Sequence, residues 1–98
     1  MTVLSEDPGY AYPELLVETD WLQEHLEDPE IRVIDCDPIE MYLRAHIRNA
    51  VGLRVHHYLK QPPEPGREYG IHVMTPDQIA DFMGDLGVGK DTQVVTYD

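Results

Sequence analysis

The side chains best suited to covalent or metal chemistry in this chain are one cysteine and five histidines. The cysteine, Cys36, stands between Asp35 and Asp37. A reactive cysteine works as a thiolate, and neighbouring carboxylates raise the pKa of a thiol because they disfavour its anion. We therefore interpret Cys36 as a structural cysteine with no part in nucleophilic chemistry.

The histidines invite a metal interpretation, because neutral imidazoles are common zinc ligands. They are His25, His46, His56, His57 and His72. No pair stands in the two-plus-two arrangement with cysteines that is typical of structural zinc sites, and His56 and His57 would point to opposite faces of a strand. We expect no metal site and no cofactor, and we keep a metal-responsive binding domain only as the weakest functional hypothesis.

Charged and polar residues after the second predicted strand could bind small anions or organise turns. Arg44, Arg48 and Arg54 carry guanidinium groups of the kind that hold small anions, but we interpret them as solvated surface residues. Asp35 can cap the turn that follows its strand, and His46 can anchor the next turn through ring hydrogen bonds. Both are interpreted as structural.

Size and charge limit the range of possible functions. Ninety-eight residues form at most one small domain. The net charge of −12 repels phosphate backbones, so we expect no nucleic-acid partner. The chain shows no signal-peptide pattern and no apolar run long enough to cross a bilayer, and one cysteine cannot form an internal disulfide. We expect a cytoplasmic protein without a membrane partner.

Short apolar runs predict about four strands. The expected strands are 15–17, 31–35, 50–53 and 94–97. Between them we expect helices, because Thr19 is placed to cap one that contains Trp21 and Leu22, and Pro38 is placed to open another. Residues 61–70 are rich in proline and glycine and predict a loop.

The clearest helix signal begins at Thr75-Pro76-Asp77-Gln78, which reads as a capping box with proline at the first helical position. The apolar residues that follow recur at i, i+3, i+4 and i+7, and they are Ile79, Phe82, Met83 and Leu86. Gly87 is a natural left-handed end for this helix. Three to four helices alternating with strands predict an α/β fold with a parallel sheet.

The order of these segments resembles the rhodanese domain. In that family, a strand ending in aspartate and a short helix precede a Gly-His-Ile-Pro-Gly-Ala segment, and Ala45-His46-Ile47-Arg48-Asn49-Ala50 matches it at three of six positions. His72-Val73-Met74, Leu86-Gly87-Val88 and the segment 93–98 are similar to the amino-terminal domain of two-domain thiosulfate or mercaptopyruvate sulfurtransferases. The resemblance covers residues 15–98 and implies a rhodanese-like sheet flanked by helices.

The resemblance also implies where the chemistry lies in the family. In active rhodanese domains, the strand similar to 94–97 ends in the cysteine that carries a persulfide, whereas this chain has Asp98. A carboxylate cannot hold a sulfane sulfur, because this chemistry needs a polarizable thiolate. We therefore expect no catalytic residue in this chain, which alone should be inactive.

For the other motif residues, the resemblance implies supporting roles. His46 is mostly architectural in the family, and the segment similar to His72 lines the cleft between domains, so His72 is the substrate-cleft candidate. This chain lacks the acid that accompanies it at the place resembling His56. Arg48-Asn49 replaces the usual Pro-Gly pair, which implies a differently shaped turn, and the donor-binding arginines of the family belong largely to the other domain.

The expected organisation is a flexible tail, 1–14, followed by a partial rhodanese-like domain, 15–98, that is truncated before the loop after the last strand. In the family's strand order, a strand missing here lies between the strands similar to 15–17 and 94–97. The incomplete sheet therefore implies a fragment whose partner is a missing carboxyl-terminal rhodanese domain or a second chain.

Two functional hypotheses from different classes follow. In the favoured one, the chain is the non-catalytic amino-terminal part of a sulfurtransferase that moves sulfane sulfur from thiosulfate or 3-mercaptopyruvate to cyanide or a thiol. In the alternative, it is a stand-alone rhodanese-like interaction module without turnover. A downstream domain with a cysteine loop would distinguish the first from the second.

Overall fold

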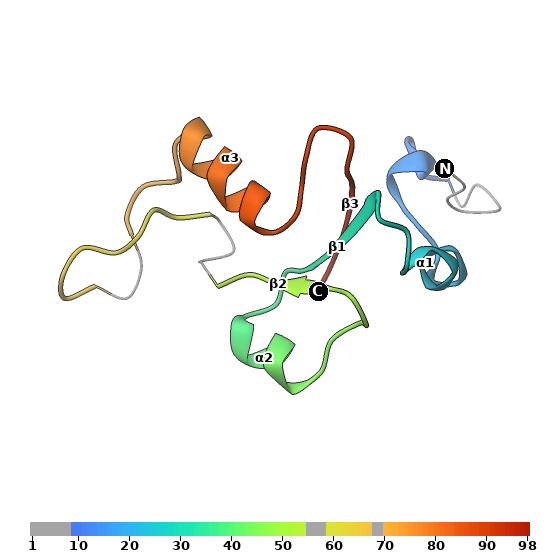
Figure 1. Cartoon of the computed structure of the whole chain (residues 1–98), viewed down its shortest axis with the longest axis horizontal. Helices are drawn as coiled ribbons and strands as arrows, with labels where there is room; N and C mark the ends of the chain where they lie inside the picture. The colour runs from blue at the N-terminus through green and yellow to red at the C-terminus, as the bar shows by residue number, and fades with distance from the viewer. Residues whose placement is uncertain (1–8, 55–58, 68–69) are drawn as a thin grey trace.

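The centre of the fold is a three-stranded parallel sheet, seen in a computed structural model that describes residues 9–54, 59–67 and 70–98 (Figure 1). The strands are β1 (Ile31–Asp35), β2 (Val51–Gly52) and β3 (Gln93–Tyr97), in the order β2-β1-β3. The helices are α1 (Thr19–His25), α2 (Ile39–Arg44) and α3 (Pro76–Asp85), with a 3-10 turn, η1 (Pro13–Leu15), before them. The predicted α/β class with a parallel sheet is confirmed.

The register of the sheet decides which side chains meet at its edge. β1 pairs with β3 along its whole length, from Ile31 opposite Gln93 to Asp35 opposite Tyr97. β2 pairs only with the last two residues of β1, so that Gly52 also lies opposite Asp35. All three strands therefore end together, with Asp35 at the centre.

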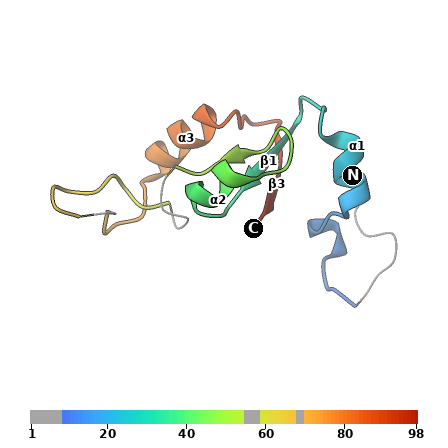
Figure 2. The same cartoon turned by 90° about the horizontal axis from the view of Figure 1, so that it is seen from below.

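A small apolar core forms between α1 and one face of the sheet. It is built on Leu22, Val33, Ala50 and Val95, all buried. Figures 1 and 2 show α1 and α3 on opposite sides of the sheet. α2 packs against β2, where a side chain at Gly52 would meet the ring of Tyr42, so this close approach requires glycine.

The start of α3 has the predicted capping box. Oγ1 of Thr75 accepts the backbone N–H of Gln78 at 3.2 Å, and the Gln78 side chain accepts the N–H of Thr75 at 2.9 Å. At the other end Gly87 has a φ of 89°, the left-handed conformation that the sequence predicted. α3 has no basic residue in its last turn, but the Arg32 guanidinium lies against Gly87 and places a positive charge there.

Two local predictions near the amino end are wrong. Residues 15–17 do not form a strand: Pro13 opens a 3-10 turn through Leu15, and the strand pairs of the described sheet do not include residues 15–17. The described sheet therefore has three strands, not about four. Thr19 does not cap α1 either, because the helical bond from Leu22 N–H to Glu18 O makes Glu18 the cap residue.

Residues 59–67 and 70–74, called here the arm, extend away from the sheet (Figures 1 and 2). The predicted loop 61–70 carries no helix or strand in its described part. The two sides of the arm touch through an antiparallel bridge between Lys60 and Val73, and Gln61 N–H donates to His72 O at 2.8 Å. The arm is therefore held mainly by its own backbone. No helix in the described part of the chain is long and apolar enough to span a membrane.

Candidate functional site

The candidate site is the carboxyl edge of the sheet, where three strands end side by side. Asp35, Cys36 and Asp37 come at the end of β1, and Tyr97 and Asp98 at the end of β3. Ligands of open parallel sheets bind outside the carboxyl ends of the strands, because the turns there are free to carry chemistry. The structure thus brings together Asp35 and Asp98, two residues that the sequence singled out separately.

Asp35 is a buried carboxylate whose two oxygens are both used. Only 1% of the residue is exposed. Its Oδ1 accepts the backbone N–H of Asp37 at 2.8 Å, and its Oδ2 accepts the hydroxyl of Tyr97 at 2.9 Å. An ionised carboxylate is an acceptor on both oxygens, and both donors here suit that state. Asp35 therefore organises the edge and faces no open solvent.

Tyr97 connects this edge to the turn before β2. Its hydroxyl oxygen accepts the backbone N–H of Ile47 at 3.0 Å while its proton goes to Asp35. Burial raises the pKa of Tyr97, the Ile47 N–H opposes that shift, and the hydrogen bond and charge of Asp35 add to it. The phenol therefore stays protonated and remains a donor at neutral pH.

The turn 45–50 is also held by a ring stack and side-chain hydrogen bonds. The ring of His46 stacks on that of Tyr42, with centroids 3.9 Å apart, and its Nδ1 lies 2.8 Å from Tyr42 O. The Tyr42 hydroxyl donates to Ala50 O at 3.0 Å. Asn49 has a left-handed φ of 69° at the place where the rhodanese pattern has glycine, and its Nδ2 donates to Leu26 O at 2.9 Å. Asparagine tolerates that conformation better than most residues do.

The thiol of Cys36 has a raised pKa at this edge, which makes it a weak nucleophile. Burial raises the pKa of its thiol, and the charges of Asp35, Asp98 and Asp37 raise it further. The sequence pointed to the two flanking acids only, because the contribution of Asp98 depends on the pairing of β1 with β3. A protonated thiol is a poor nucleophile, so this cysteine lacks the electropositive surroundings of a reactive one.

Asp37, the residue after Cys36, also has a raised pKa. Partial burial comes first among the causes that raise its pKa, followed by the negative charges of Asp35 and Asp98. The edge therefore has a negative field, in which a small anion gains no favourable contact.

The other residues singled out in the sequence lie elsewhere. His72 is exposed on the arm, which extends away from the sheet edge. His25 repeats the arrangement of His46: its ring stacks on Trp21 and its Nδ1 lies 2.7 Å from Trp21 O. His56 and His57 lie outside the described residues. Arg48 forms an ion pair with Glu27.

A metal centre finds no support in the residues that the structure describes. None of their histidine, cysteine, aspartate and glutamate side chains gather in a group of three or more that could hold an ion. The two described histidines with ring contacts, His25 and His46, each have Nδ1 within hydrogen-bond distance of the carbonyl four residues earlier.

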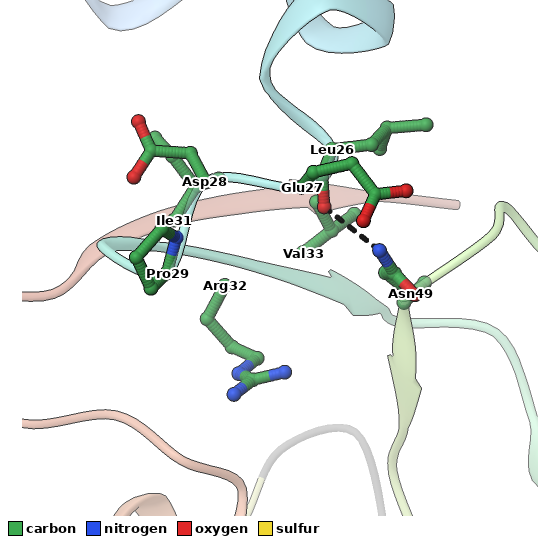
Figure 3. A pocket seen from close by; sticks show the side chains of 9 residues that line it. Leu26, Glu27, Asp28, Pro29, Ile31, Arg32, Val33 and Asn49 are labelled. Carbon is green, nitrogen blue, oxygen red and sulfur yellow. Dashed lines mark hydrogen bonds between the residues drawn. The ribbon is translucent and has the colours of Figure 1, made fainter.

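Two hollows flank the sheet away from its carboxyl edge. One, of about 350 Å³, lies where α1 leads into β1 and beside Asn49 (Figure 3). Figure 3 shows Arg32 pointing from β1 away from Asp28, and the buried Nε of Arg32 has no hydrogen-bond partner among the described residues. The other, a groove of about 410 Å³, runs between residues 14–17 and residues 93–96 of β3. The sequence analysis places a missing strand between these same two segments, and that strand stays a prediction.

Comparisons with known proteins agree with this architecture. The rhodanese-like domain family matches residues 18–98. The chain is 40% identical over 90 residues to the sulfur carrier protein TtuD of Thermus thermophilus, and 37% identical over 90 residues to a putative thiosulfate sulfurtransferase, SseA, of Mycobacterium leprae. Each match covers 91% of this chain.

A third relative, the 3-mercaptopyruvate sulfurtransferase of Escherichia coli, is 32% identical over 94 residues, which cover 84% of this chain. The chain spans 30%, 28% and 31% of the lengths of these three relatives, respectively. The family match extends from the start of α1 through β3, so it includes the whole described sheet. The chain belongs to the rhodanese-like domain family.

Proposed function

We propose that this chain is the non-catalytic amino-terminal part of a sulfurtransferase that moves sulfane sulfur from thiosulfate or 3-mercaptopyruvate to cyanide or a thiol. The observation that carries the proposal is Asp98, which follows β3 at the carboxyl edge. This is the place where the rhodanese pattern has the cysteine that accepts sulfur.

The chemistry of sulfur transfer supports a silent role for this edge. A thiolate must attack the outer sulfur of thiosulfate or the single sulfur of 3-mercaptopyruvate. It then holds that sulfur as a persulfide while sulfite or pyruvate leaves, and releases it to the acceptor. Asp98 cannot form that bond. Cys36 is the nearest alternative, but its thiol is held protonated by burial and three carboxylates. Both proposed donors are anions, so this negative edge alone gives them no binding site.

The proposal places the reactive cysteine in a missing carboxyl-terminal rhodanese domain or a second chain. Its support is that the chain spans about 30% of its relatives and that β3 pairs with no described strand on its outer side. We further propose that the missing part supplies a strand to the groove beside β3, where Leu15, Leu16 and Val94 leave apolar surface exposed. The assembled protein would work in the cytoplasm.

Within the proposal, His72 contributes to the wall of the substrate cleft. Its support is exposure: the imidazole lies on the arm, between the exposed side chains of Ile71 and Val73. Asp35 and His46 serve structure, because Asp35 accepts hydrogen bonds from the Asp37 N–H and the Tyr97 hydroxyl, and Nδ1 of His46 lies 2.8 Å from Tyr42 O.

The test compares this 98-residue chain with the full-length protein that contains it, using thiosulfate with cyanide and 3-mercaptopyruvate with a thiol. We expect turnover only in the full-length protein, and a persulfide, located by mass spectrometry, on a cysteine outside residues 1–98. A Cys36→Ser variant is the control and should keep full activity. A persulfide on Cys36, or turnover by the 98-residue chain alone, would contradict the proposal.

The same assay tests a second function, a rhodanese-like interaction module without turnover. The observation that favours it is the carboxyl edge itself, which holds three carboxylates beside a protonated thiol. Absence of sulfur transfer in the full-length protein with either donor would favour this module over the enzyme.

A further inference from the structure

One hydroxyl group joins three segments of the chain at the carboxyl edge. The Tyr97 hydroxyl donates to Asp35 at the end of β1 and accepts the N–H of Ile47 in the turn 45–50. The partners are 62 and 50 residues away in the sequence. Because Tyr97 is itself the last residue of β3, the two bonds fix the ends of β1 and β3 relative to that turn.

The partner of this hydroxyl must be a carboxylate. Asp35 accepts a hydrogen bond on each oxygen, from Tyr97 and from the backbone of Asp37. An asparagine has one acceptor oxygen and would turn N–H donors toward one of these two donors. Asp35 is also buried and forms no ion pair with any described residue, which costs free energy. Buried charges without an ion pair are expected mainly at sites that need a fixed geometry.

The arrangement controls the chain at the point where it leaves the sheet. The backbone N–H of Cys36 donates to Tyr97 O at 2.8 Å, so main-chain pairing continues to the last residue of β3. Asp98 is the first residue beyond it. The position and direction of Asp98 therefore depend on how firmly Tyr97 is held.

We propose that Tyr97 and Asp35 are positioning residues for the substrate cleft: together they set the course of the chain at Asp98, and so the shape of the cleft wall that this domain presents. This inference rests on the proposed function. Neither residue contacts substrate; Asp35 acts through the Tyr97 hydroxyl, and Tyr97 acts through the backbone that it holds.

The chain offers a closely matched control. The Tyr42 hydroxyl also holds the turn 45–50, by donating to Ala50 O at 3.0 Å, but Tyr42 belongs to α2 and not to β3. Tyr42→Phe and Tyr97→Phe each remove one hydroxyl that bonds to the same turn. Only the second releases the end of β3.

The experiment measures kcat, KM for thiosulfate and the thermal midpoint in the full-length protein, for wild type and both variants. We expect Tyr97→Phe to raise KM about fivefold with kcat within about twofold, because the cleft wall loses its fixed position while the reacting cysteine lies elsewhere. Tyr42→Phe should leave both constants within about twofold of wild type. Asp35→Asn should raise KM in the same direction as Tyr97→Phe.

The outcomes separate this inference from the proposed function. A full-length wild type without sulfur transfer overturns both. An active wild type in which Tyr97→Phe behaves like Tyr42→Phe, whether both change KM or neither does, overturns the inference alone. If Tyr97→Phe shows no cooperative thermal transition, Asp35→Asn decides by the same criterion, and an unchanged KM in that variant overturns the inference.

Discussion

The carboxyl edge of the sheet and the arm differ in how their polar groups are used. At the edge, the side-chain oxygens of Asp35 and Tyr97 are all hydrogen-bonded, and the Tyr97 hydroxyl links β3 to β1 and to the turn 45–50. On the arm, hydrogen bonds link residues 59–61 to residues 71–74. His72 is exposed there, between the exposed side chains of Ile71 and Val73. The edge therefore supplies rigid geometry without a nucleophile, whereas the arm supplies accessible side chains with little support.

The largest effect that this comparison predicts is on stability. Asp35→Ala removes the acceptor of both the Tyr97 hydroxyl and the Asp37 N–H, and should lower the free energy of unfolding by about 3 kcal/mol. His72→Ala on the arm should change it by less than about 0.5 kcal/mol. Urea unfolding of both variants in the same background checks the difference, and equal losses would refute the contrast between edge and arm.

α3 connects the arm to β3, and the chain turns at Gly87, just after the carboxyl end of α3. Gly87→Ala places a side chain against the Arg32 guanidinium at a φ of 89°, and should cost about 2 kcal/mol. Gly84→Ala is the matched control, because a side chain there meets nothing within 4 Å and alanine favours the helix by up to about 1 kcal/mol. Thermal unfolding checks this: Gly87→Ala should lower the midpoint, and Gly84→Ala should raise it.

The reactivity of Cys36 tests the negative field at the edge. Its pKa lies above the ordinary 9.0, so alkylation by iodoacetamide should be slow at neutral pH and rise with pH. An Asp37→Asn, Asp98→Asn double variant should alkylate several-fold faster, because two of the three carboxylates that disfavour the thiolate are gone. A matched double variant at the exposed acids Asp77 and Asp81 of α3 should leave the rate unchanged.

The smallest expected effect is on the pH dependence of stability. The folded-state pKa of Asp37 lies above its ordinary 3.8, so the folded chain binds this proton more tightly than the unfolded chain does. The contribution of Asp37 to stability is therefore present at low pH and is lost as pH rises through the folded pKa. Asp37→Asn should remove that part of the slope in thermal midpoints measured from about pH 3 to about pH 7. An unchanged slope would show that burial and the neighbouring carboxylates do not raise the pKa of Asp37.

Local sequence signals were enough for the elements that depend on local contacts. The capping box at Thr75 and the left-handed Gly87 involve residues three or four apart, and both are as predicted. β1 follows from its run of branched apolar residues. The short strand predicted at 15–17 was wrong because a strand depends on a hydrogen-bonded partner, and no described strand pairs with these residues.

The site was less predictable because its contacts are distant in the sequence. Asp35 and Asp98 stood out by their types and positions, but Tyr97 did not, because its tie to Asp35 spans 62 residues. The only available signal was a tyrosine at the end of a predicted strand, opposite another strand that ends in aspartate. Pairing those two strands in register would have brought the two side chains together.

The open side of β3 has a consequence for handling the protein. Residues 93–97 contain no charge, proline or bulge that would discourage pairing with another β-strand, and Val94 is 40% exposed. Such a segment can act as a template for intermolecular sheets. The isolated 98-residue polypeptide should therefore self-associate as its concentration rises, and a Val94→Lys substitution should keep it monomeric.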